Sequence, residues 1–197
     1  MTRGIARPGP SSRADFCRAG LAILRDEGPQ AATVDRLCAA LGRTKGSFYH
    51  HFRDAGAFQA ALLAEWEAVQ TEQPIAVADG QAPARRAAAL REAVVKGLDH
   101  PLDRAVRAWG RHDARVREAI RRVDRRRIAF LAGLHRARGR RRPERLAELE
   151  YAAFVGAQEL GLVTDPERGP GVARALEAAL EWLGRPPTSR RRRSQRA

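Results

Sequence analysis

The stretch of sequence that decides the fold is residues 33–52, which read TVDRLCAALGRTKGSFYHHF. Leu37 and Leu41 lie four residues apart and share one face of a helix, and Thr33 stands before them, where its hydroxyl caps free N–H groups. Gly42 follows the last apolar residue, where a left-handed helix end costs a glycine least. These residues predict a short helix that ends in a tight turn.

A second helix is predicted from Lys45 to Phe52, with Thr44 as its N-cap. Phe48 and Phe52 are four residues apart, so both face inward onto the first helix. The opposite face carries cations, hydroxyls and rings without an acid, at Lys45, Ser47, Tyr49, His50 and Arg53. A short helix with such a face, held at an angle by its neighbour, suits a DNA major groove and the flanking phosphates.

The order of these residues resembles the DNA-binding domain of TetR-type transcriptional regulators, and the resemblance extends over residues 12–66. It is carried by the small residues and Gly42 that lead into the turn, by the Thr44 cap, and by the ending Tyr49-His50-His51-Phe52. The resemblance implies an all-α fold, in which an N-terminal three-helix head with a helix-turn-helix is followed by a helical ligand-binding and dimerisation domain. The absence of alternating β-branched runs agrees with an all-α chain.

The candidates for DNA contacts are the polar residues in and around the second helix: Thr33, Arg43, Thr44, Lys45, Ser47, Tyr49, His50, His51 and Arg53. Most of them are expected to fix the register on the phosphate backbone, while Lys45, Ser47 and His50 reach base edges. Two positions depart from the family pattern. Arg43 replaces a small apolar residue in the turn and is expected to reach a phosphate instead; Ala55 replaces a lysine and removes one phosphate contact.

The chain has 197 residues, of which 44% are hydrophobic and 30% charged, and its formal net charge is +14. Such a charge favours a polyanionic partner, because neutralising phosphates releases counterions. The alternative is compositional, since Lys45 and Lys96 are the only lysines, and a GC-rich genome favours Arg and Ala whatever the function. The concentration of basic side chains on one helix face favours a functional role.

The two cysteines, Cys17 and Cys38, lie on predicted apolar helix faces and form no CxxC motif. They are expected to be buried and reduced, so neither a metal site nor a cofactor is predicted. Since no apolar run approaches the roughly 20 residues that span a bilayer, and no signal-like segment begins the chain, we expect no membrane partner and a cytoplasmic protein.

Four segments are predicted along the chain: a flexible arm at residues 1–11, the helix-turn-helix domain at 12–54, a helical effector-binding and dimerisation domain at 55–184, and a disordered Arg-rich tail at 185–197. Residues 71–83 contain several turn formers, among them Pro74 and Pro83, and are expected to form a loop.

A small-molecule effector is expected to lie among aromatic and apolar side chains of the second domain. The candidates are Trp66, Leu98, Trp109, His112, Arg127, Phe130, Tyr151 and Phe154. The alternative for each of these residues is that it belongs to the hydrophobic core and lines no ligand site. Arg127 lies on an apolar stripe and is expected to be solvated; the alternative is that it faces a cavity, paired with Asp124 or an anionic ligand. The mixture favours a hydrophobic or aromatic effector with one polar handle.

Small and apolar residues on the last two predicted helices are candidates for a dimer interface: Ala153, Gly156, Ala157, Leu160, Leu176, Ala179, Leu180 and Leu183. The resemblance implies that these helices pair with their own copy as a four-helix bundle. Internal packing within one chain is the alternative.

These patterns predict a ligand-responsive transcriptional regulator, a repressor, that binds a near-palindromic double-stranded DNA operator as a homodimer and is released by an apolar or aromatic effector. An enzyme is not expected, because the histidines form no HExxH motif and the glycines form neither GxGxxG nor a P-loop. The alternative function, motivated by Arg43 and Ala55, is a dimeric small-molecule-binding or protein-interaction module whose head no longer reads DNA specifically.

Overall fold

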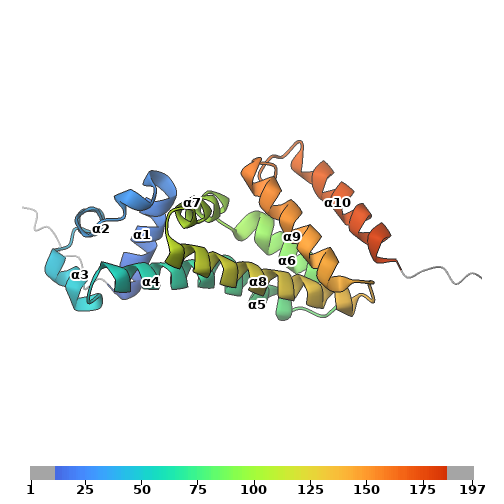
Figure 1. The fold of residues 1–197 in the computed structure, drawn as a ribbon, viewed down its shortest axis with the longest axis horizontal. Helices are drawn as coiled ribbons and strands as arrows, with labels where there is room; N and C mark the ends of the chain where they lie inside the picture. The colour runs from blue at the N-terminus through green and yellow to red at the C-terminus, as the bar shows by residue number, and fades with distance from the viewer. Residues whose placement is uncertain (1–11, 186–197) are drawn as a thin grey trace, which may run out of the picture. The chain divides into compact units, whose positions relative to one another are not determined.

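The computed structural model describes residues 12–185, and this part of the chain is helical without a strand (Figure 1). The predicted arm at 1–11 and the tail beyond Arg185 lie outside the described residues. The elements are α1 (Arg13–Glu27), η1 (Pro29–Ala31), α2 (Val34–Leu41), α3 (Lys45–His51), α4 (Ala55–Glu67), η2 (Ala68–Glu72), α5 (Gln73–Asp79), α6 (Arg86–Gly97), α7 (His100–Gly110), α8 (Ala114–Ala137), α9 (Pro143–Glu159) and α10 (Gly169–Gly184). The predicted all-α class is confirmed.

The chain divides into two compact units, with the boundary inside α8 between Arg125 and Arg126. We call them the N-terminal unit and the C-terminal unit. The N-terminal unit holds α1 to α7 and the first half of α8, so the helix-turn-helix shares its unit with the helices that follow it. The C-terminal unit holds the second half of α8 together with α9 and α10.

The head of the N-terminal unit closes around an aromatic cluster. Phe16, Phe48 and Phe52 are almost fully buried, and the ring centroids of Phe48 lie 5.6 Å from Phe16 and 5.1 Å from Phe52. Phe58 of α4 joins them, at 5.4 Å from Phe48. Gly20 of α1 permits this close approach, because a Cβ there would lie 2.8 Å from the Phe58 ring. Burial of several aromatic rings fixes the orientation of α3.

The caps predicted from the sequence are present. The hydroxyls of Thr33 and Thr44 accept hydrogen bonds from the amides of Arg36 and Ser47, at 3.2 and 3.3 Å, and Gly42 adopts the left-handed conformation with φ of 62°. The second helix ends one residue earlier than expected, since Phe52 is extended and directs the chain into α4.

The prediction of a loop over residues 71–83 is wrong for most of that stretch. The chain remains helical from α4 through the π-helix η2 into α5, and only residues 80–85 form the connection to α6. Pro74 lies in the first turn of α5, directly after the π-helical turn η2, and a proline is tolerated in a first turn because its missing N–H has no partner there. The sequence analysis therefore took Pro74 for a loop residue, although it lies within a helix.

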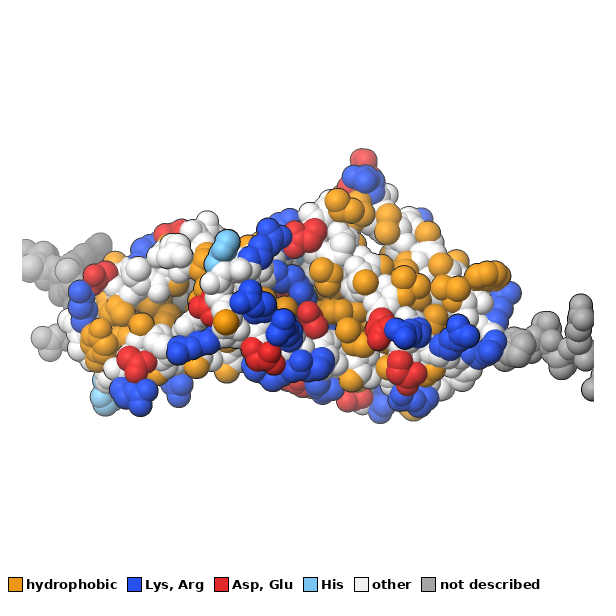
Figure 2. Space-filling model, in the orientation of Figure 1, with side chains coloured by type: hydrophobic (Ala, Val, Ile, Leu, Met, Phe, Trp, Pro, Cys, Tyr) orange, Lys and Arg blue, Asp and Glu red, His pale blue; other side chains and the backbone are white. Residues whose placement is uncertain are grey.

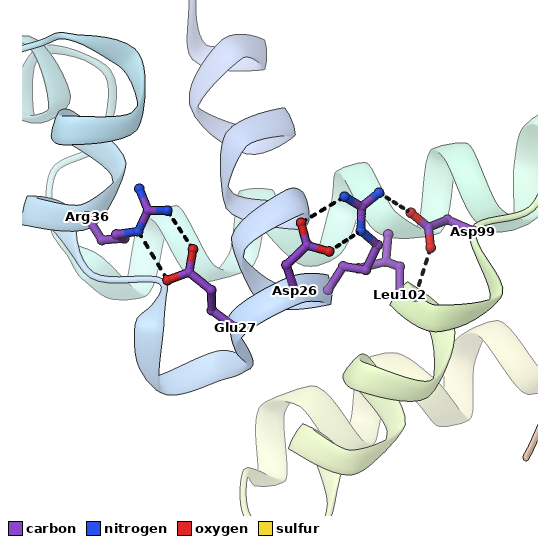
Figure 3. Close-up of polar contacts among 6 residues, drawn as sticks. Asp26, Glu27, Arg36, Asp99 and Leu102 are labelled. Atoms are coloured by element: carbon purple, nitrogen blue, oxygen red, sulfur yellow. Dashed lines mark hydrogen bonds and ion pairs between the residues drawn. The ribbon is translucent and has the colours of Figure 1, made fainter.

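Polar contacts attach α7 to α1 within the N-terminal unit (Figure 3). The guanidinium of Arg25 donates to Asp26 at 2.6 and 2.8 Å and to Asp99 at 3.1 Å. Asp99 also caps α7, accepting from the amide of Leu102 at 3.0 Å. The hydrogen bonds to Asp26, and then to Asp99, raise the pKa of Arg25. This bridge joins the end of α1 to the beginning of α7.

The C-terminal unit packs α9 against α10 and the end of α8. Its buried apolar side chains include Leu146, Ala147 and Leu180. His135 of α8 is also buried, and its Nε2 lies 2.8 Å from a carboxylate oxygen of Glu150 on α9. These contacts join the three helices within this unit.

Candidate nucleic-acid interface

The buried aromatic residues of α3 determine which of its side chains reach solvent. Because Phe48 and Phe52 anchor the helix, two of the three residues between them, Tyr49 and His50, reach solvent. Tyr49 is 54% exposed and His50 is also exposed, whereas His51 is half-buried, with its ring 5.8 Å from that of Phe16. The outer face of α3 therefore presents a phenol and an imidazole beside each other.

Two cations of the predicted site already have carboxylate partners. Lys45 Nζ lies 2.7 Å from Asp35 Oδ1 of α2, and Arg53 Nε lies 2.9 Å from Asp54 Oδ2. The hydrogen bond to Asp35 raises the pKa of Lys45, so its ammonium stays protonated. The Asp54 carboxyl has a lowered pKa, chiefly because it accepts from the amide of Ala57.

These carboxylates were missed in the sequence, because only the face of α3 itself was examined for acids. Asp35 belongs to α2, and only the turn between the helices brings it to Lys45. The N-cap pattern at Asp54 was visible, but its pairing with Arg53 was not considered. Both ion pairs are largely exposed, so each contributes little to stability and can exchange for a phosphate.

The remaining DNA-contact candidates lie at the helix ends and in the turn. Thr33 and Thr44 use their hydroxyls as caps while staying exposed, and Ser47 is half-buried. Arg43 follows Gly42 in the turn and is half-buried, with its amide donating to the Cys38 carbonyl at 2.8 Å. All of the predicted residues except Thr33, which caps the start of α2, therefore lie in α3 or in the turns on either side of it.

The predicted effector-pocket residues divide between the two units. In the N-terminal unit, Trp66 is fully buried and its Nε1 donates to Asp103 Oδ1 at 2.9 Å, which makes it a core residue. Trp109 packs half-buried against the same core, Leu98 is half-buried, and His112 is exposed. This unit therefore does not bring its four candidates into one enclosed group.

In the C-terminal unit, Arg127 is buried, and the expectation that it is solvated is wrong. Its Nη1 donates to the hydroxyl of Tyr151 at 3.3 Å, and the Tyr151 ring lies 6.3 Å from that of Phe154. Phe130 is half-buried. Asp124, the partner considered for Arg127, forms an ion pair with Arg107 at 2.7 Å.

A groove with a cavity volume of about 410 Å³ lies in the C-terminal unit. Its walls come from the segment that follows α8 and from α10 with its C-cap: Arg138, Gly139, Arg140, Glu177, Glu181, Gly184 and Arg185. None of the predicted pocket residues lines this groove, and its walls carry both signs of charge.

Several of the predicted dimer-interface residues are exposed. Leu160 is 73% and Leu183 48% exposed, and Gly156 and Ala179 are also exposed. Leu180 is the exception, because it is buried between α9 and α10 within one chain. The sequence analysis missed Trp182, which is 68% exposed; a large exposed aromatic neighbour of Leu183 on an amphipathic helix was the available signal. Ala153, Ala157 and Leu176 are half-buried.

Cys17 and Cys38 are buried and free, as predicted. Burial raises the pKa of both thiols, which keeps them protonated. Within residues 12–185, His, Cys, Asp and Glu side chains form no cluster of three or more suited to a metal ion, and no helix there has the length and apolar character to cross a bilayer.

The geometry of α2 and α3 defines a helix-turn-helix protein of the all-helical class. Residues 17–57 match the family model described as bacterial regulatory proteins, tetR family. The head of this chain is therefore a TetR-type helix-turn-helix domain, and the resemblance drawn from its sequence is confirmed.

Solved structures share the fold over most of the described chain. NemR from E. coli, in its reduced form, superposes with a TM-score of 0.72 at 19% identity and covers 90% of this chain and 100% of its own. A putative transcriptional regulator from Pseudomonas aeruginosa PAO1 has a TM-score of 0.69 at 20% identity and covers 93% of this chain and 95% of its own. A putative TetR-family regulator from Rhodococcus sp. has a TM-score of 0.68 at 15% identity and covers 88% of this chain and 98% of its own. The chain has the fold of TetR-type transcriptional regulators, while no curated protein sequence matches it.

Proposed function

We propose that this chain is a ligand-responsive transcriptional repressor, which binds a near-palindromic operator as a homodimer and is released by a small apolar or aromatic effector. In this proposal it works in the cytoplasm, α3 enters the major groove, and the residues at its ends hold the phosphates. The observation that carries the proposal is the outward face of α3, with Tyr49 and His50 exposed above a fixed aromatic core.

The exposed apolar surface of α9 and α10 supports the homodimer. Leu160, Trp182 and Leu183 face solvent in the single chain, and exposed apolar side chains of this size on adjoining helices are typical of protein interfaces. A second copy that presents the same surface buries both sets in a symmetric contact.

The buried pair of Arg127 and Tyr151 supports an effector site in the C-terminal unit. The Tyr151 ring lies beside the Phe154 ring, and its hydroxyl accepts from the Arg127 guanidinium, so a polar pair stands next to an aromatic side chain. This combination suits an aromatic ligand with one hydrogen-bonding or anionic group.

The test is equilibrium binding to an operator selected from random DNA. His50→Ala should reduce the preference for the selected operator over a scrambled duplex about tenfold, as the loss of a base contact does. Tyr49→Ala should weaken binding to both duplexes alike, because a phosphate contact carries no sequence information. If His50→Ala weakens both duplexes equally, His50 does not read bases.

A second function is favoured by the ion pairs of Lys45 with Asp35 and of Arg53 with Asp54, which occupy two cations of the recognition face. In that case the chain is a dimeric small-molecule-binding or protein-interaction module whose head does not read DNA. A selection that enriches no sequence at low salt, performed on folded dimeric protein, would favour this second function.

A further inference from the structure

Arg115, at the beginning of α8, lies beside the first turn of α4. Its Nη1 is 3.4 Å from the point where a Cβ would stand on Gly56, the second residue of α4. Gly56 is four residues after Phe52, where the recognition helix ends. A cation from a distant part of the N-terminal unit therefore stands next to the helix-turn-helix.

The turn that carries Arg115 is fixed onto α4. Gln59 Nε2 donates to Asp113 Oδ2 at 2.8 Å, while Asp113 Oδ1 caps α8 by accepting from the amides of Arg115 and Val116. The hydrogen bond from Gln59 is also the main cause of the lowered pKa of Asp113. Val116 is fully buried in the same core as α4. Both polar and apolar contacts thus determine where Arg115 stands.

The charge of Arg115 acts on the nearby Asp113 carboxyl and is one of the smaller causes of the lowered pKa of that group. Its guanidinium makes no hydrogen bond or ion pair with any residue between 12 and 185 that the structure records. Its neighbours along α8 differ: Arg122 binds Glu67, and Arg121 and Arg125 share Glu118. On the face shown in Figure 2, Lys and Arg side chains gather over α8. Structural pairing accounts for those arginines of α8 but not for Arg115.

Two other arginines contact or belong to the same short segment, residues 52–56. Arg13 of α1 holds its Cζ 5.3 Å from the centroid of the Phe52 ring, and the side chain of Arg53 is 89% exposed. Four residues of chain span at most about 14 Å. Since each strand of a DNA duplex carries one phosphate per about 3.4 Å of helix axis, a strand passing this segment presents more than one phosphate to the three arginines.

The carboxylates nearest to Arg115 accept hydrogen bonds from the protein, although the Asp54 side chain is still 49% exposed. Asp54 accepts from the Ala57 amide and from Arg53, and Asp113 accepts from Gln59 and from α8. They reduce the local positive charge, but their oxygen atoms are occupied by protein donors. Ala55 itself carries no charge, so the cation at the first turn of α4 comes from Arg115.

We propose that Arg115 binds the DNA phosphate backbone beside the bases read by α3, together with Arg13 and Arg53. The partner is duplex DNA, and the contact extends the interface from the helix-turn-helix to the junction of α7 and α8. This inference rests on the proposed DNA-binding function and adds a binding residue outside the head.

The experiment measures the salt dependence of operator binding by the full chain for Arg115→Ala, Arg115→Lys and Arg125→Ala. Arg125→Ala is the matched control, because it removes the same charge ten residues further along α8, about 15 Å away, and leaves Glu118 paired with Arg121. Arg115→Ala should weaken binding about tenfold. The slope of log K against log salt concentration should fall by about 0.9 per lost contact, hence about 1.8 in a dimer.

Two further readouts separate a phosphate contact from a structural role. Arg115→Ala should weaken the operator and a scrambled duplex by the same factor, and Arg115→Lys should restore most of the slope. Equal slopes for Arg115→Ala and Arg125→Ala would overturn this inference while leaving the proposed function intact. Wild-type protein without preference for any selected duplex would instead overturn the proposed function, so the two failures are distinguishable.

Discussion

The helix-turn-helix head and the α9–α10 pair are both helical, yet their large apolar side chains differ in exposure to solvent. In the head, Phe16, Phe48 and Phe52 are enclosed by helices of the same chain. On α9 and α10, Leu160 and Trp182 are more than two-thirds exposed. Burying a leucine fully is worth about 1.5–3 kcal/mol, so the second surface leaves several such contributions unused in the single chain.

The difference indicates which part of the chain buries its large apolar side chains without a partner. The head buries its aromatic side chains within one chain and exposes polar side chains. Such a surface suits a polar, charged partner. The α9–α10 surface is apolar where it meets solvent, which suits a second copy of itself. Each region can be tested by a substitution that should damage one surface and leave the other unaffected.

The largest effect is expected from Phe48→Ala. Its ring contacts Phe16, Phe52 and Phe58, and the cavity left by a buried phenylalanine costs about 3–5 kcal/mol. Urea unfolding monitored by circular dichroism should show this loss. Tyr49→Ala, one residue away on the exposed face, should change stability by less than about 0.5 kcal/mol. Equal losses for the two variants would mean that the orientation assigned to α3 is wrong.

A smaller effect, on assembly, is expected from Leu183→Glu. A carboxylate within the proposed apolar contact should weaken the dimer by about 2 kcal/mol or more, because an unpaired charge is buried. Sedimentation equilibrium measures the shift. Val77→Glu provides the control, since Val77 is similarly exposed at 53% but lies on α5. A dimer unchanged by Leu183→Glu would place the interface elsewhere.

Tyr151→Phe should cost about 1 kcal/mol of stability, because it removes a buried hydroxyl that accepts from Arg127. Thermal unfolding compared with Tyr49→Phe isolates the buried hydroxyl from the exposed one. In the proposed function, the same variant weakens binding of an aromatic effector that uses this polar pair. A stability equal to that of the wild type would show that the contact contributes nothing.

The smallest effect concerns pH and the start of α1. Asp15 completes a capping box with Ser12, and hydrogen bonds from Ser12 lower its pKa from 3.8 to about 2. Since the pKa is lower in the folded state, the contribution is complete above pH 3.8 and is lost as pH falls to about 2. The difference in melting temperature between the wild type and Asp15→Asn should therefore shrink over this range. A difference that stays constant with pH would contradict the assignment.

Local signals predicted the head well, whereas contacts between distant residues escaped the sequence. Thr33, Gly42 and Thr44 act within four residues of themselves, so their roles could be predicted from order alone. Pro74 was misread because a π turn before it is not visible as a pattern. The pairing of Lys45 with Asp35 and the place of Arg115 beside Gly56 depend on how helices pack, which no spacing rule predicts.

The central claim is that α3 reads duplex DNA and that a symmetric pair of chains presents it twice. Footprinting on a fragment selected from random DNA tests this most directly. Two protected half-sites related by a dyad are predicted, with centres about 34 Å or one helical turn apart, or a multiple of it. His50→Ala should keep the spacing and lose the preference for the half-site sequence. Protection of one isolated half-site, or equal protection of every sequence, would contradict the claim.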